Sequence, residues 1–177
     1  MTEDGQPGPR WLWLLRHAKA ADPTPGGTDH DRVLTARGRR DAAALGARLP
    51  ALGLERVALP GAILCSTAAR TTETAAGVAG GLGVDVDRRR SLYYASPEGV
   101  LGEIRTADDA VRSLMVVGHN PATHVLALGL LAEDDPDRAR LGRFPTCALA
   151  VFRLDAARWT DAAEGTAVLA GFLAPPY

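Results

Sequence analysis

Several features that mark particular classes of protein are scarce in this sequence. Of its 177 residues only 2 are cysteines and 5% are aromatic, and no apolar run approaches the roughly 20 residues of a bilayer-spanning helix. Two cysteines make no disulfide framework, which favours the reducing cytoplasm. The apolar run at residues 11–15 is too short for a secretory signal. We therefore expect a cytoplasmic protein that has no membrane partner.

An excess of positive charge is also lacking, because the formal net charge is −1 at pH 7. Without a basic field over the surface, nucleic acid is not an expected partner. Lys19 is the only lysine, and all other basic residues are arginines. Arginine binds phosphate through two parallel hydrogen bonds, although a G+C-rich genome would produce the same bias. The position of each arginine must therefore decide its meaning.

Short apolar runs alternate with helical patterns along the chain, as is typical of βαβ units. Strands are expected at residues 11–15, 62–65, 114–117, 147–154 and 168–172. Helices are expected after Thr35, after Ser66 or Thr67 as far as Gly80, after Ser96, and from Asn120 and Pro121 onward. The pattern predicts an α/β fold, a three-layer αβα sandwich with a mostly parallel central sheet.

The length predicts a single domain at residues 10–177, preceded by a flexible tail at residues 1–9. A long polar loop at residues 20–34 is expected to be functional, because idle loops of this length are uncommon in compact domains. The charged connector at residues 133–143 is expected to be solvated.

Two histidines and two arginines follow the predicted strands. Arg16 and His17 follow the first strand, Arg70 lies one turn into the helix after the second, and His119 and Asn120 follow the third. Ligands of open α/β sheets bind beyond the carboxyl ends of the strands. These side chains are therefore expected to meet at one edge of the sheet.

Such a group of side chains suits phosphoryl transfer. Arg16, Arg70 and His119 could bind the phosphoryl oxygens without a metal, with Asn120 as a further candidate. His17 could attack phosphorus with a ring nitrogen, because neighbouring guanidinium charges lower its pKa and keep it neutral. A backbone carbonyl is expected to hold its other nitrogen.

Each residue taken singly also has a structural interpretation. Arg16 could be a surface cation, Arg70 a salt-bridge partner of Glu73 or of a nearby acid, and each histidine a loop or core residue. His119 and His124 are five positions apart and so lie on different helical faces, unlike zinc ligands four apart. The sequence also lacks a Gly-rich loop followed by Lys-Ser/Thr, which argues against a nucleotide triphosphatase. We therefore do not expect a catalytic metal.

Three separated motifs carry a family resemblance: LLRHA at residues 14–18, STAART at residues 66–71 and GHNP at residues 118–121. Together they resemble the histidine phosphatase superfamily. The RHA form and the short chain resemble its SixA-type branch of phosphohistidine phosphatases. The resemblance implies a phosphoglycerate mutase-like fold without a large cap domain. It also implies that His17 is the phosphorylated nucleophile, that Arg16, Arg70 and His119 bind phosphate, and that no metal or organic cofactor takes part.

One feature departs from many members of that superfamily. They carry a glutamate before the third motif that protonates the leaving group, whereas residues 92–96 hold no carboxylate here. Asp31 and Glu98 are the candidate acids, although Asp31 could instead pair with Arg32 or Arg37. A phosphohistidine nitrogen leaves more easily than an alkoxide and so needs less help from an acid.

Three functions remain open from the sequence. The leading hypothesis is a metal-independent phosphatase that acts through phosphorylated His17 on phosphohistidine in a protein. The first alternative is a phosphomonoesterase for a small phosphorylated metabolite, which would need an acid such as Asp31 or Glu98. The second is a non-catalytic phosphoprotein-binding domain, which would bind phosphate without turnover.

Overall fold

The computed structural model describes residues 8–51 and 57–177. Six strands form one sheet in the order β3-β2-β4-β1-β5-β6. They are β1 (Arg10–Arg16), β2 (Ala62–Ser66), β3 (Val86–Arg89), β4 (Ser113–Gly118), β5 (Leu149–Leu154) and β6 (Ala167–Leu173). Neighbouring strands from β3 to β1 are parallel, whereas β5 is antiparallel to both β1 and β6.

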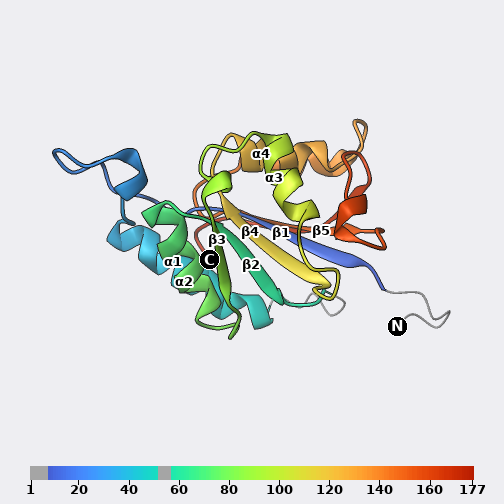
Figure 1. Cartoon of the computed structure of the whole chain (residues 1–177), viewed down its shortest axis with the longest axis horizontal. Helices are drawn as coiled ribbons and strands as arrows, with labels where there is room; N and C mark the ends of the chain where they lie inside the picture. Colours follow the sequence, from blue (N-terminus) through green and yellow to red (C-terminus); the bar gives the residue numbers. More distant parts are fainter. Residues whose placement is uncertain (1–7, 52–56) are drawn as a thin grey trace.

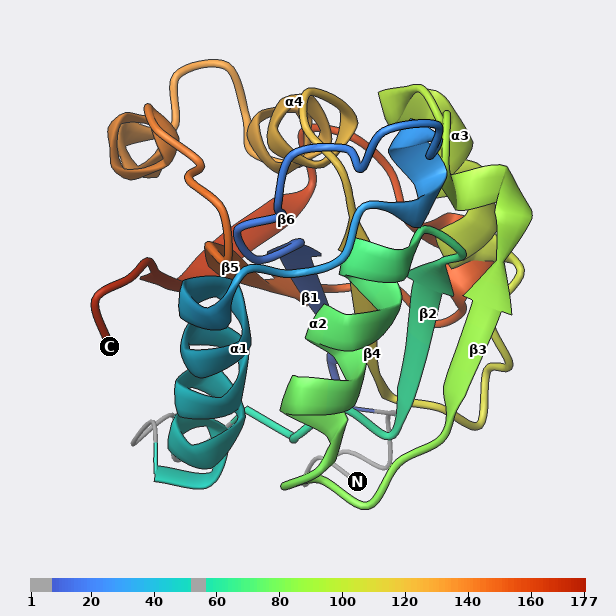
Figure 2. The same ribbon diagram turned by 90° about the vertical axis from the view of Figure 1, so that its left-hand side faces the viewer.

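Helices cover both faces of this sheet. They are α1 (Ala36–Arg48), α2 (Ala69–Ala79), α3 (Pro97–Arg105) and α4 (Ala122–Gly129). Helices α1 and α2 lie on one face, and α3 and α4 lie on the other (Figure 1; Figure 2). The predicted three-layer sandwich with a mostly parallel sheet is therefore confirmed.

Alternate side chains of β1 pack against the helices on opposite faces of the sheet. Leu12 and Leu14 pack with the apolar side chains of α3 and α4, whereas Trp13 and Leu15 pack with those of α1 and α2. Successive side chains of a strand point to opposite faces, so a strand buried on both faces must be apolar throughout. This requirement explains the unbroken apolar run that predicted the strand.

Two helix starts are capped as the sequence predicts. The Thr35 hydroxyl accepts from the backbone N–H of Gly38 at the start of α1, and the Ser96 hydroxyl accepts from that of Gly99 at the start of α3. Such caps satisfy a backbone donor that has no partner within the helix. The expected cap of α2 is wrong, because α2 begins later and its N-cap is Ala68.

The structure differs from the sequence analysis at two other places. Strand β3 was not predicted, because it is a four-residue edge strand, VDRR, with charged, largely exposed residues. The connector at residues 133–143 is not simply solvated. It contains a 3-10 helix (Pro136–Leu141) whose Leu141 is buried, and Arg138 donates to the carbonyl of Leu128 over 2.6 Å.

The predicted tail at residues 1–9 falls mostly outside the described residues, so the domain boundary stays a prediction. In the part of the chain that the structure describes, every helix is too short or too polar to cross a bilayer.

Candidate active site

The carboxyl ends of three strands meet at one edge of the sheet. Strands β2, β4 and β1 are neighbours and run parallel. Arg16 at the end of β1 lies opposite Gly118 at the end of β4, and the His17 N–H donates to the Gly118 carbonyl over 3.1 Å. The ring centroids of His17 and His119 are consequently 5.3 Å apart. The structure thus brings both histidines to the edge expected from the sequence.

One ring nitrogen of His17 is hydrogen-bonded to the backbone, and the other is not. Its Nδ1 lies 2.8 Å from the carbonyl oxygen of Ala18. Because a carbonyl can only accept, Nδ1 carries the hydrogen and Nε2 keeps a free lone pair. Burial, and then the charges of Arg70 and Arg16, lower the pKa of His17 to about 4. The imidazole is therefore neutral at pH 7, which a nucleophile requires.

His119 is oriented by the last residue of β2. The Ser66 Oγ lies 2.8 Å from Nε2 of His119. Because the Ser66 side chain is buried and its hydroxyl hydrogen has no other acceptor among the described residues, we assign Ser66 as the donor to Nε2. With Ser66 donating to Nε2, the proton of His119 is on Nδ1. Burial first, and then the neighbouring His17 and Arg70, lower the pKa of His119 to about 3. This use of Ser66 explains why it does not cap α2.

Three buried polar atoms at or just after the carboxyl ends of β1 and β4 have no partner among the described residues: His119 Nδ1, Arg16 Nε and Asn120 Oδ1. Arg16 and Asn120 are both held by one carbonyl, since each donates to the Phe144 oxygen, over 2.8 and 3.0 Å. A buried donor without an acceptor costs about 1–3 kcal/mol. Two such donors, on Arg16 and on the residue after its strand partner Gly118, indicate a site for an anionic ligand.

Arg70 is the second residue of α2 and is only 7% exposed. Its Nη1 donates to the backbone carbonyl of Asp29 over 2.6 Å, and its Nη2 donates to the Asp29 carboxylate over 2.9 Å. Arg70 therefore forms the salt bridge of its structural interpretation, with Asp29 as the acid, whereas the Glu73 carboxylate pairs with Arg39. Helix α2 therefore directs Arg70 toward the strand ends and not along its own surface.

Asp29 is a site residue that the sequence reasoning missed. Its carboxylate also accepts from Arg32 over 2.9 Å and from the Tyr93 hydroxyl over 2.9 Å. These hydrogen bonds, with that from Arg70, hold the pKa of Asp29 well below its usual range. Asp29 is therefore ionised at neutral pH and links the loop at residues 20–34 to the site.

The structure does not bring the two expected acids to the four central residues. Asp31 is exposed and accepts from the Thr28 hydroxyl over 2.6 Å, which lowers its pKa. Its expected pairing with Arg32 or Arg37 is wrong, since these arginines pair with Asp29 and Asp41. Glu98 is exposed in the first turn of α3, and hydrogen bonds beginning with that to Ser96 lower its pKa.

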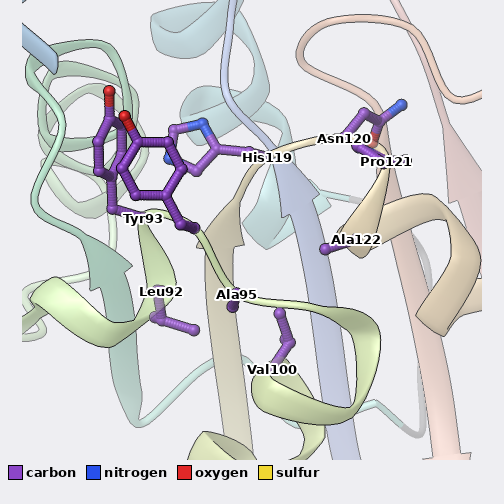
Figure 3. Close-up of a pocket in the computed structure, with 9 residues that line it drawn as sticks. Leu92, Tyr93, Ala95, Val100, His119, Asn120, Pro121 and Ala122 are labelled. Atoms are coloured by element: carbon purple, nitrogen blue, oxygen red, sulfur yellow. The ribbon is translucent and has the colours of Figure 1, made fainter. Parts of the chain in front are cut away.

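A cavity of about 200 Å³ opens beside His119. Figure 3 shows the Tyr93 ring beside His119, with Pro121 and Ala122 across from it. The Tyr93 ring meets His119 edge to face at 5.6 Å between centroids. Within residues 8–51 and 57–177, no three His, Cys, Asp or Glu side chains are grouped as metal ligands.

Comparison with known proteins relates this geometry to a family. Residues 12–93 match the model of the histidine phosphatase superfamily (branch 1). The uncharacterized protein Rv1276c of Mycobacterium tuberculosis is 41% identical over 171 residues, which cover 91% of this chain and 99% of that protein. The chain belongs to the histidine phosphatase superfamily.

Two solved structures are similar over almost their whole length. A protein of Nakamurella multipartitia, provisionally named phosphohistidine phosphatase SixA, has a TM-score of 0.85 and 29% identity, with 97% of this chain and 99% of that chain covered. The protein of that name from Agrobacterium tumefaciens has a TM-score of 0.76 and 34% identity, with 94% and 99% covered. Within the superfamily, the chain is of the SixA type and has the phosphoglycerate mutase-like fold.

Proposed function

We propose that this protein is a metal-independent phosphatase that works through a covalent phosphohistidine on His17 and removes phosphate from phosphohistidine in a protein. The observation that carries the proposal is the tautomer in which His17 is fixed. Its Nδ1 donates to the Ala18 carbonyl, so its free Nε2 is the atom available for attack. The ring centroid stands 5.3 Å from that of His119, and Nδ1 of His119 and Nε of Arg16 have no partner among the described residues.

The reaction would run in two displacements. In the first, Nε2 of His17 forms a bond to phosphorus while the bond from phosphorus to the leaving nitrogen breaks, and that nitrogen keeps the electron pair and takes a proton from solvent water. In the second, water attacks the phosphorus of phosphorylated His17, which releases orthophosphate and restores the neutral imidazole. Arg16, Arg70 and Nδ1 of His119 would bind the equatorial oxygens, on which the negative charge is concentrated in both steps.

The state of Asp29 supports a nitrogen leaving group over an alkoxide. Asp29 is the carboxylate bonded to Arg70, and its pKa is held well below the usual range. A carboxylate that stays ionised has no proton to give to a departing alkoxide. An imidazole is a far better leaving group and needs less assistance. Asp29 therefore favours phosphohistidine over an alkyl phosphate such as a sugar phosphate.

The comparisons support the same choice. The two similar structures carry the name phosphohistidine phosphatase, and this chain matches them over 97% and 94% of its length. A single small domain without a large cap leaves the strand ends accessible to a bulky substrate. A phosphorylated side chain on the surface of another protein could therefore reach His17.

The test is to trap the phosphorylated protein. We would mix it with a protein that has been phosphorylated on histidine by phosphoramidate, quench rapidly, and map the phosphate by mass spectrometry. The expected result is acid-labile, base-stable phosphate on His17, in the same amount with and without a chelator. His17→Ala should lower turnover by several orders of magnitude, as expected for loss of a nucleophile.

The matched control is His124→Gln, which changes a histidine whose Nε2 bonds to the Leu141 carbonyl. Because glutamine can also donate to that carbonyl, this variant should keep near-normal turnover. Normal turnover in His17→Ala would overturn the mechanism. Phosphate binding without turnover in the native protein would favour a binding domain. Faster turnover of alkyl phosphates than of phosphohistidine would favour a phosphomonoesterase.

A further inference from the structure

The cavity beside His119 has a composition that the phosphate chemistry does not explain. It is lined by Tyr93, Tyr94, Leu92, Val100 and Pro121, among others, and no charged side chain lines it. It touches His119 but not His17. In an in-line displacement the leaving group departs on the side of phosphorus opposite the nucleophile. A cavity that adjoins the phosphate site away from His17 is therefore suited to receive part of the leaving group.

Tyr94 is the unusual member of this wall. Its side chain is 84% exposed, although its ring lies only 4.1 Å from that of Tyr93 between centroids. Tyr93 is itself fixed, because its hydroxyl donates to Asp29 and its ring contacts His30 and His119 edge to face. A fixed aromatic ring carrying a second, exposed ring forms a platform at the mouth of the cavity.

Resting on the proposed function, the geometry points to a subsite for the leaving group: the Tyr93–Tyr94 platform and the adjoining cavity bind an uncharged planar ring attached to the transferred phosphoryl group. Aromatic side chains bind such rings by offset stacking or edge-to-face contact. A cavity of about 150 Å³ accommodates a benzene ring, so the volume of about 200 Å³ here fits one ring. Tyr94 is then a specificity-determining residue.

The lining also argues against a sugar as occupant. A sugar needs several hydrogen-bond partners for its hydroxyl groups, since polar groups buried without partners are costly. The cavity offers only the Tyr hydroxyls, His119 and Asn120, and the remaining lining side chains are apolar. Asn120 already uses its amide nitrogen on the Phe144 carbonyl and His119 uses Nε2 on Ser66. Of their side-chain polar atoms, only Asn120 Oδ1 and His119 Nδ1 are left without partners among the described residues, which are few for the several hydroxyl groups of a sugar. A flat ring with few polar atoms matches this surface better.

Two small phosphoryl donors separate ring binding from phosphate binding. Both N-phosphoimidazole and phosphoramidate carry a phosphorus–nitrogen bond, but only the first carries a ring. The quantity to measure is the ratio of their kcat/KM values. In Tyr94→Ala this ratio should fall about fivefold to tenfold, which is the size of an aromatic contact. In Tyr94→Phe it should stay within about twofold of the native ratio, because the ring is kept.

The control is Val168→Ala, which also truncates an exposed apolar side chain, 49% exposed on β6, and should leave the ratio unchanged. An unchanged ratio in Tyr94→Ala would overturn the subsite. So would an equal loss for both donors, which would mean that Tyr94 acts on the phosphate site. If the native protein cleaves neither donor through His17, the proposed function fails and the subsite fails with it. That result can be distinguished from failure of the subsite alone, because it is seen in the native protein before any Tyr94 variant is measured.

Discussion

Arg70 donates twice to Asp29, once to its backbone carbonyl and once to its carboxylate. The two residues come from different parts of the chain, Arg70 from α2 and Asp29 from the loop at residues 20–34. Their contact fixes the guanidinium group at the strand ends, where it lowers the pKa of both histidines. The long polar loop thus has a defined place in the site, as a support for the arginine.

Removing the Asp29 carboxylate should weaken substrate binding. Asp29→Ala takes away the charge-assisted bond to Arg70, so Arg70 is less well fixed for phosphate. The carboxylate side chain is 51% exposed, so solvent screening limits the effect to about 1 kcal/mol, or roughly fivefold. We expect KM for a phosphohistidine donor to rise about fivefold and kcat to change less. A fall in KM would show instead that Asp29 competes with phosphate for Arg70.

The two carboxylates first expected as acids should be dispensable. Asp31→Asn and Glu98→Gln each remove an ionised, exposed carboxylate that bonds to a nearby Thr or Ser. We expect kcat on a histidine-phosphorylated protein to stay within about twofold of the native value, because neither group is placed to give a proton. Steady-state kinetics would check this. A large loss of kcat in either variant would show that the carboxylate moves into the site during turnover.

The central residues were predictable because of simple regularities. Arg16, His17 and His119 follow apolar runs, and the carboxyl ends of parallel strands share one edge of the sheet. Asp29 was not predictable in this way. It lies in a loop without periodicity and reaches a partner 41 positions away, so only the folded path of the chain shows the contact.

Strand β3 escaped prediction and the start of α2 was placed wrongly for related reasons. Strand β3 is short and charged, and it forms because its backbone pairs with β2 at the sheet edge, not because its side chains form an apolar run. The predicted start of α2 is wrong because local patterns favour Ser66 or Thr67 as the cap, whereas tertiary contacts direct the Ser66 hydroxyl to His119. In both cases a partner distant in sequence decides the outcome.

The titration of His17 gives a direct check on the electrostatics of the site. Its pKa is lowered to about 4, mainly by burial, against about 6.5 for an exposed histidine. In an NMR titration, the ring proton signals of His17, assigned with His17→Gln, should shift with a midpoint near pH 4. The nucleophile would then stay neutral from pH 8 down to pH 5. A midpoint near pH 6.5 would contradict the buried, arginine-flanked setting.

The same lowered pKa values bear on stability. Below pH 6.5 the unfolded chain binds a proton on each histidine, while folded His17 and His119, with pKa values of about 4 and 3, do not. Wherever the unfolded state binds more protons than the folded state, stability falls as the pH is lowered. Both histidines therefore make the fold less stable as the pH falls from about 6.5 to 4. Urea unfolding at pH 7 and pH 5 should show less loss of stability in His17→Gln than in the native protein. An equal loss in both would contradict this linkage.

The contact between α1 and α2 offers a test of packing with a built-in control. A Cβ atom on Gly46 of α1 would lie 2.7 Å from the carbonyl oxygen of Gly77 in α2, closer than two such atoms can approach. Gly46→Ala must therefore push the helices apart, although alanine favours the helix by about 1 kcal/mol. Overpacking costs about 1–3 kcal/mol, so we expect a net loss of stability. Because a domain of this size loses about 2–4 °C in Tm per kcal/mol, the melting temperature should fall by several degrees.

Gly102→Ala is the matched control, because Gly102 lies within α3 and a Cβ atom there would meet nothing within 4 Å. The same replacement should here raise stability by about 0.5–1 kcal/mol, since only the helix preference of alanine remains. Thermal unfolding of both variants beside the native protein measures the difference in sign. If Gly46→Ala were as stable as Gly102→Ala, the two helices would not be in the close contact that the structure shows. A loss in both would mean that helix preference does not govern either position.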